Sequence, residues 1–200
     1  MDSGNDYPVS AYGARMLRMI DLSLDLFKME TGVYCLKAEP VDLLAVIRRI
    51  VAELGPIVAS KELTLAVSVD GAPGNGRTFM VHGDELLCHS MLANLIKNAV
   101  EASPEGEIVG ISLGREAAGS EILIRNKGSM PADMRARFFE KYATSGKPGG
   151  TGLGAYSARL IAETHGGAVC LDTPRPGETT LKVFLPNPDG SREFTGRADA

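Results

Sequence analysis

The stretch MLANLIKNAVEAS, residues 91–103, is the most informative segment of the sequence. Its apolar residues recur at spacings of three and four, as in an amphipathic helix: Leu92, Leu95, Ala99 and Ala102. Asn94 and Asn98 are four residues apart, so their side chains lie on one face of that helix, one turn apart. Burying a carboxamide is costly unless a partner or a ligand binds it. The helix therefore either exposes two asparagines to solvent or carries part of a binding site.

The composition is that of an ordinary globular domain. The chain has 200 residues, of which 44% are hydrophobic and 23% charged, enough to form one domain with a core. The net charge of −4 does not favour a nucleic-acid partner. No apolar run approaches the length of a membrane span and the first residues do not resemble a signal segment, so we expect a cytoplasmic location, whether or not the full-length protein is anchored in a membrane.

The three cysteines, Cys35, Cys88 and Cys170, are widely spaced and form no CxxC pair. This spacing argues against a disulfide framework or a zinc site and suits a reducing compartment. We expect all three to be buried or half-buried thiols.

The remaining chain alternates between helical patterns and pairs of strands. Hydrophobic periodicity predicts further helices over 14–30, 41–54, 132–140 and 152–164, and strands over 63–69, 78–81, 108–113, 121–125, 168–171 and 180–185. A short extended piece is expected at 33–36, and Asp84 is expected to cap the central helix. Paired strands with helices between them predict an α/β two-layer sandwich, with a mixed, mostly antiparallel sheet covered on one face by helices.

Two loops could bind a ligand. Gly149, Gly150, Gly152 and Gly154 precede a predicted helix, and glycines let a backbone approach a phosphate near the free amides of a helix N-terminus. The string is neither a P-loop nor a full dinucleotide fingerprint, so by itself it is also compatible with a plain surface loop. Asn126 leaves a predicted strand two residues before Gly128, which suits either a pocket or an ordinary turn.

Taken together, the motifs are more specific. NxxxNAxxAS on a helix, a strand-end NxG followed by MP, the segment FFEKYATSGK, and GGTGLG opening a helix occur in this order. This order resembles the ATP-binding catalytic domain of sensor histidine kinases, in the superfamily that includes the Hsp90 and MutL ATPases. The resemblance covers residues 41–186 and implies a Bergerat-type fold, with ATP and Mg²⁺ as cofactors.

The resemblance implies roles for individual residues. Asn98 corresponds to the Mg²⁺ ligand, and Asn94, one turn earlier, to a catalytic position that lines the same site. Lys147 corresponds to a lid residue that meets the γ-phosphate. Asn126 stands where the family has an adenine-binding aspartate, so the charge of that contact is missing here. The remaining nucleotide-binding positions that the resemblance implies are Lys97, Gly128, Met130, Phe139, Gly150, Thr151, Gly152, Leu153, Gly154 and Thr179.

One position bears on the reaction. Where the Hsp90- and MutL-like ATPases have a glutamate that orients the attacking water, this chain has Asn94. The resemblance therefore favours phosphoryl transfer to a side chain over hydrolysis. None of His82, His89 and His165 lies in the context of a phosphoacceptor, so each is expected to be structural or at the surface.

The resemblance also implies a domain organisation. Residues 14–32 resemble the end of a dimerisation hairpin, with a seam of Leu17, Ile20, Leu24 and Phe27. The acceptor histidine would then lie upstream, in a full-length homodimer with a response regulator as its partner. Residues 33–186 would form the catalytic domain, between polar tails at 1–13 and 187–200. The alternatives are a serine/threonine-directed kinase of the same superfamily and a non-catalytic nucleotide-binding or interaction module.

Overall fold

The structure is a computed structural model that describes residues 13, 23–128, 130–143, 152–175 and 177–188 of the chain. The chain forms two compact units, Met1–Cys35 and Leu36–Ala200. In the first unit, residues 23–30 are helical, and Leu24 and Phe27 of the predicted seam are 53% and 62% exposed. Residues 14–22 of the predicted helix, including the other half of the seam, lie outside the described residues.

The second unit contains a six-stranded sheet with the strand order β3-β2-β5-β6-β8-β7. Strands β2 and β5 pair in parallel, and the other pairs are antiparallel. This confirms the predicted mixed, mostly antiparallel sheet. The strands are β2 (Thr64–Val69), β3 (Ala72–Pro73), β5 (Ile108–Glu116), β6 (Gly119–Lys127), β7 (Ala168–Asp172) and β8 (Glu178–Pro186).

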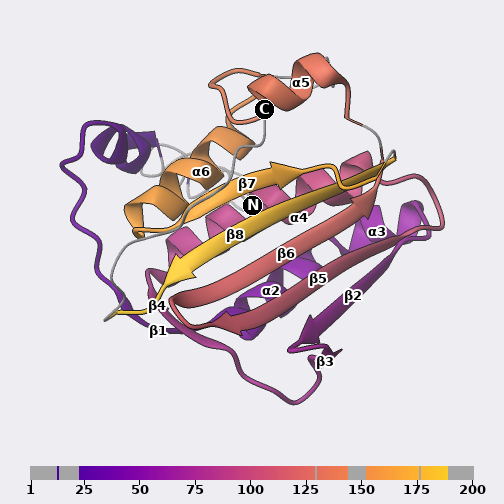
Figure 1. Cartoon of the computed structure of the whole chain (residues 1–200), viewed down its shortest axis with the longest axis horizontal. Coiled ribbons are helices and arrows are strands. Elements are labelled where there is room, and N and C mark those ends of the chain that lie inside the picture. Colours follow the sequence, from indigo (N-terminus) through magenta and orange to yellow (C-terminus); the bar gives the residue numbers. More distant parts are fainter. Residues whose placement is uncertain (1–12, 14–22, 129, 144–151, 176, 189–200) are drawn as a thin grey trace, which may run out of the picture. The chain divides into compact units, whose positions relative to one another are not determined.

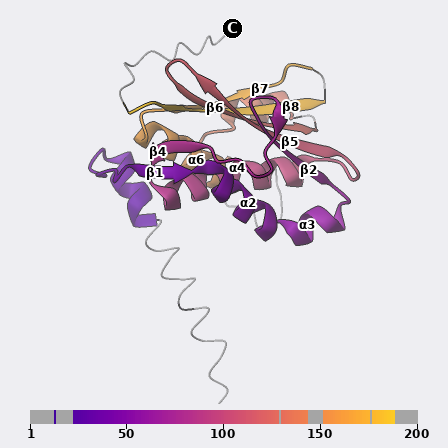
Figure 2. The same cartoon turned by 90° about the horizontal axis from the view of Figure 1, so that it is seen from below.

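Helices cover one face of this sheet (Figures 1 and 2). They are α2 (Leu43–Glu53), α3 (Gly55–Ser60), α4 (Glu85–Ala102) and α6 (Gly154–Thr164), and a short helix α5 (Ala132–Arg137) follows β6. The core lies between the two layers. Its fully buried residues include Met91, Leu92, Leu95 and Ile96 of α4, and Ile111, Leu113, Ile122 and Ile124 of the sheet. Burying one such side chain contributes about 1.5–3 kcal/mol, so α4 is the central element of the core.

Several predicted boundaries were wrong. Strand β1 (Glu39–Asp42), which pairs with β4 (Met80–Gly83) in a separate two-stranded sheet, was not predicted because Pro40 interrupts any alternating pattern. Residues 33–36, expected as a short extended piece, form neither a helix nor a strand. The helix predicted over 41–54 ends at Glu53, and the short helix α3, which was not predicted, follows it with Gly55 and Pro56 in its first turn. A proline there needs no N–H partner.

The cysteines follow the prediction at two of the three positions. Cys88 is buried and Cys170 is half-buried, but Cys35 is exposed. Burial, together with the carboxylates of Asp84 and Glu85, raises the pKa of the Cys88 thiol to about 12. That thiol is therefore protonated and unreactive at neutral pH.

Both ends of α4 are held by groups from elsewhere in the chain. At the N-terminus, the Asp84 carboxylate accepts a hydrogen bond from the Leu87 N–H at 3.0 Å, as predicted. At the C-terminus, the Lys61 ammonium donates to three backbone carbonyls, those of Val100, Glu101 and Ser103. Carbonyls in a last turn lack partners within the helix, and a cation there also interacts favourably with the helix dipole.

His165, at the C-terminus of α6, contacts the start of α4. Its Nε2 accepts a hydrogen bond from the Asp84 N–H at 3.1 Å, so Nδ1 carries the proton that is donated to the Ile161 carbonyl at 2.8 Å. A Cβ added at Gly83 would lie 2.9 Å from the imidazole, so only glycine fits there. Burial lowers the pKa of His165, although the Ile161 carbonyl and the Asp84 carboxylate oppose this shift.

We expect a pH-dependent contribution of His165 to stability. The ordinary pKa is 6.5, and the folded pKa is lower. Below about pH 6.5 the unfolded state takes up a proton that the folded state does not bind, so the unfolding free energy decreases as the pH falls through the folded pKa. Urea unfolding of the wild type and of His165→Gln across this range measures the effect. The difference in unfolding free energy between the wild type and the variant should be largest above pH 6.5 and decrease on acidification. A difference that increased on acidification would contradict this prediction.

Candidate functional site

The two asparagines of α4 lie half-buried on the same face of the helix. Asn94 contacts the first turn of α6, where its Nδ2 donates to the Ser157 hydroxyl at 3.1 Å. That hydroxyl in turn donates to the Gly154 carbonyl at 2.9 Å. Asn94 is therefore fixed against α6, and the face that carries Asn98, one turn later, is directed to the same side of α4.

Asn98 differs from Asn94 in having no partner. Within the described residues, its half-buried carboxamide makes no hydrogen bond or ion pair. The Asn98 amide is not among the buried atoms that lack a partner, so it is accessible, and a carboxamide can both donate to and accept from a ligand. Lys97 lies on the exposed side of the helix instead, with its ammonium 3.7 Å from the Glu101 carboxylate.

Asn126 is buried at the end of β6, with 5% of its surface exposed. Its Nδ2 donates to the Lys127 carbonyl at 3.1 Å, which leaves Oδ1 as an acceptor without a partner among the described residues. The neighbouring position in β8 is Thr179, whose hydroxyl donates to the Gly128 carbonyl at 3.0 Å. Asn126 and Thr179, which were both predicted as site residues, are therefore adjacent.

Gly128 brings this loop against α4. Its φ of +146° suits glycine, and a Cβ at this position would lie only 2.7 Å from the Ala102 carbonyl. The Gly128 N–H also donates to the Gly177 carbonyl at 2.7 Å. Ala102 is one turn beyond Asn98, so the Asn126 loop packs at the end of α4 that follows Asn98.

Close contacts require glycine at position 152 and leave little space at position 154, at the start of α6. Gly152 has a φ of +65°, and a Cβ there would lie 2.4 Å from the carbonyl carbon of Tyr142. The Tyr142 N–H donates to the Gly152 carbonyl at 3.0 Å. At Gly154, a Cβ would lie 3.2 Å from Oδ1 of Asn94. Leu153 directly precedes α6, and no side chain among the described residues caps its first turn.

The remaining predicted site residues are only partly described. Phe139 is half-buried and packs edge-to-face against Phe138, with the ring centroids 4.9 Å apart. Lys147, Gly150 and Thr151 lie outside the described residues.

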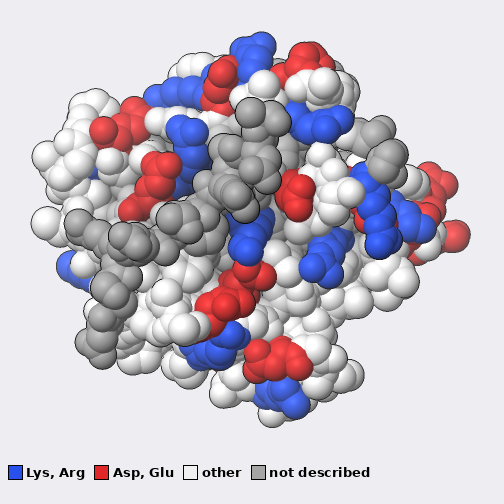
Figure 3. Space-filling model, in the orientation of Figure 1, with Lys and Arg blue, Asp and Glu red and all other residues white. Residues whose placement is uncertain are grey.

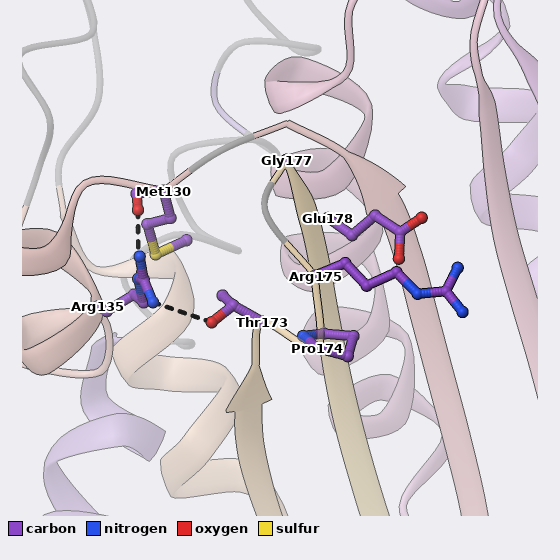
Figure 4. A pocket seen from close by; sticks show the side chains of 7 residues that line it. All are labelled: Met130, Arg135, Thr173, Pro174, Arg175, Gly177 and Glu178. Carbon is purple, nitrogen blue, oxygen red and sulfur yellow. Dashed lines mark hydrogen bonds between the residues drawn. The ribbon is translucent and has the colours of Figure 1, made fainter.

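A pocket of about 320 Å³ lies beside the loop that follows Asn126 (Figure 4). Arg135 spans it, because Nε donates to the Met130 carbonyl at 3.3 Å and Nη1 to the Thr173 hydroxyl at 3.0 Å. Of the lining residues, the sequence predicted only Met130 as part of the site. The sequence around Arg135, an exposed arginine in a short helix, contains no pattern that would predict this contact. The lining residues are Met130, Arg135, Thr173, Pro174, Arg175, Gly177 and Glu178.

Charged side chains do not by themselves define the site. Figure 3 shows basic and acidic residues interspersed over the face in view. In the described ranges, no group of three or more His, Cys, Asp and Glu side chains could hold a metal ion. A metal ion near Asn98 would therefore need most of its ligands from phosphates and water, which is how Mg²⁺ usually binds beside nucleotides.

The described helices also include none that is both long and apolar enough to cross a membrane.

Comparisons with known proteins agree with this geometry. The sequence model of the family described as "Histidine kinase-, DNA gyrase B-, and HSP90-like ATPase" matches residues 83–189. The sensor protein IrlS of Burkholderia pseudomallei is 29% identical over 178 residues, which are 86% of this chain and 37% of that protein. The sensor-like histidine kinase SenX3 of Mycolicibacterium smegmatis is 27% identical over 192 residues, which are 92% of this chain and 48% of that protein.

A solved structure of the mycobacterial sensor histidine kinase MprB is similar in fold, with a TM-score of 0.62 and 29% sequence identity. The match covers 74% of this chain and 97% of that one. The chain spans between a third and a half of the length of the two curated relatives described above. The resemblance read from the four motifs and the predicted α/β fold are both confirmed. The chain belongs to the histidine kinase-, DNA gyrase B- and HSP90-like ATPase family, and its relatives are sensor histidine kinases.

Proposed function

We propose that this chain binds ATP and Mg²⁺ between α4, the Asn126 loop and the start of α6, and that it transfers the γ-phosphate to a histidine on a dimerisation helix. The single observation that carries the proposal is the half-buried Asn98 carboxamide, which has no partner among the described residues. Its surroundings support a polyphosphate ligand, since α6 begins with glycines and no described side chain caps its first turn.

Asn98 is the residue that would hold the metal ion. When bound with the triphosphate, Mg²⁺ neutralises the charge that moves during phosphoryl transfer. A carboxamide oxygen is a suitable ligand for this hard cation, whose other ligands would be phosphates and water. Asn98 would thus orient the ion rather than take part in bond making.

Asn126 would recognise the adenine base. The Lys127 carbonyl accepts from Nδ2 of Asn126, so the carboxamide presents Oδ1 to the site. An oxygen in that position can accept a hydrogen bond from the adenine amino group, as an aspartate would, but without the added strength of a charge. Thr179 supports this arrangement by holding the Gly128 carbonyl.

The position of Asn94 argues for transfer rather than hydrolysis. A carboxamide does not act as a base toward water, and the Asn94 amino group already donates to Ser157. Phosphoryl transfer depends mostly on positioning and on charge neutralisation, so a site without a base can still serve an acceptor side chain that is brought to it.

The partners belong to the proposal as well. The curated relatives are sensor proteins, so we propose a cytoplasmic domain in a homodimeric sensor kinase, with a response regulator as the next acceptor. The exposed Leu24 and Phe27 on the helix at 23–30 are consistent with packing against a dimerisation helix. The neutral Asn126 favours one further candidate, a non-catalytic module that binds nucleotide weakly.

Replacing Asn98 tests the metal-dependent binding. We expect calorimetry to show Mg²⁺-dependent binding of ATP to the wild type, and Asn98→Ala to weaken it by roughly 1–3 kcal/mol because a ligand of the ion is lost. His89→Ala is a matched control, since it removes a half-buried polar side chain from the opposite face of the same helix, where it bonds Glu53. Unchanged binding in Asn98→Ala, or equal losses in both variants, would contradict the assignment.

Base selectivity tests Asn126. The wild type should bind ATP more tightly than inosine triphosphate, because inosine has a carbonyl where adenine has the amino group that donates to Asn126. In Asn126→Ala the preference should fall by about tenfold, which corresponds to about 1.4 kcal/mol for one hydrogen bond. Competition binding measures the ratio, which is insensitive to a modest general loss of stability. A ratio that did not change would remove Asn126 from the base contact.

The acceptor distinguishes the alternatives. The full-length protein, incubated with ATP labelled at the γ-phosphate, should incorporate a label that is labile in acid and stable in alkali, as phosphohistidine is. A label that is stable in acid would support a serine/threonine-directed kinase instead. Binding of Mg·ATP without any label would support the non-catalytic module.

A further inference from the structure

A chain of hydrogen bonds links α4 to the first turn of α6. Asn94 Nδ2 donates to the Ser157 hydroxyl at 3.1 Å, and this hydroxyl donates to the Gly154 carbonyl at 2.9 Å. Ser157 is buried, with 4% of its surface exposed, so water has little access to replace the partners in these two hydrogen bonds. The amide of α4 is thus coupled to the backbone at the start of α6 through one hydroxyl group.

The rest of α6 is held differently. Its later turns place Ala158, Ile161 and Ala162 in the core with no exposed surface, and α4 and α6 pack against each other. The first turn contributes no buried apolar side chain, because residues 154–156 are all half-buried, and no described side chain caps it. The hydrogen bonds through Ser157 join this turn to α4.

These contacts occupy Asn94. Its amino group is used by Ser157, and its Oδ1 lies against the backbone of α6, 3.2 Å from where a Cβ on Gly154 would be. Asn98, one turn along the same face, has no partner in the described part of the chain. Two residues of the same type on one helix face are thus in different states, one committed to the protein and one available to a ligand.

We infer that Asn94 and Ser157 form a positioning pair, which holds the first turn of α6 at a fixed distance from Asn98 and contacts neither Mg²⁺ nor the nucleotide. The inference rests on the proposed function, because it concerns the same site. It reassigns Asn94, which the family resemblance places at a catalytic position, and it adds Ser157, which no motif singles out. The pair holds the glycine-rich start of α6 close to Asn98, so that both can contact the phosphates of the nucleotide.

The test is a double-mutant cycle read by two binding parameters. Calorimetry gives the affinity for ATP at saturating Mg²⁺ and the Mg²⁺ concentration at half-maximal binding, for the wild type, Asn94→Ala, Ser157→Ala, the double variant and Asn98→Ala. We expect each single variant of the pair to weaken ATP binding by roughly tenfold and the double variant to be no weaker, because both remove the same link. The Mg²⁺ requirement should rise in Asn98→Ala and stay unchanged in the pair.

Ser120→Ala is the matched control for a general loss of stability. Ser120 is also a buried serine, 2% exposed, whose hydroxyl accepts from the Arg115 guanidinium at 2.9 Å, but it lies at the other end of β6 from Asn126. Thermal unfolding should show a similar loss of stability in Ser120→Ala and Ser157→Ala, whereas only Ser157→Ala should lose ATP affinity.

Three results would overturn the inference. One is an increased Mg²⁺ requirement in Asn94→Ala, which would make Asn94 a metal ligand. Another is an ATP affinity of Ser157→Ala equal to that of the wild type. The third is a double variant whose fold-loss of ATP affinity is the product of the fold-losses of the two single variants. Each of them presupposes that the wild type binds Mg·ATP. Absence of binding by the wild type would instead contradict the proposed function.

Discussion

Helix α4 depends on hydrogen bonds that other segments supply to its two ends. The ammonium of Lys61 serves three carbonyls at the C-terminus, and His165 fixes the residue that caps the N-terminus. A buried backbone group without a partner costs about 1–3 kcal/mol, so these contacts are comparable with the burial of a core side chain. The same helix supplies the centre of the core and the face that carries Asn98. Asn98 therefore lies on a helix that is held both by the core and at its two ends.

The sequence was most predictive where the information is local. The spacing of Leu92, Leu95 and Ala99 was sufficient to place α4, and the hairpin of β5 and β6 followed from two strand patterns separated by a short loop. The pairing of β1 with β4 and the ammonium of Lys61 at the end of α4 could not be predicted, because both join segments far apart in the chain. No periodicity encodes such partners.

The candidate site follows the same division. The motifs placed both Asn94 and Asn98 at the nucleotide site. Only the tertiary structure shows that Asn94 already donates to Ser157, whereas Asn98 has no partner in the described part of the chain. Gly128 is a similar case. The motif marks a glycine, but the reason for it is that a Cβ there would lie 2.7 Å from the Ala102 carbonyl, which depends on how β6 and α4 pack.

The parallel pairing of β2 with β5 has a consequence for the folding reaction. Antiparallel hairpins such as β5–β6 and β7–β8 join neighbouring segments and close small loops. The chain from β2 to β5 must instead pass through β3, β4 and the whole of α4 before the two strands can meet. Contacts between distant segments require more chain entropy to be lost before the contacts stabilise the structure, and they slow folding. The edge formed by β2 and β3 should therefore join the sheet late, after α4 has docked.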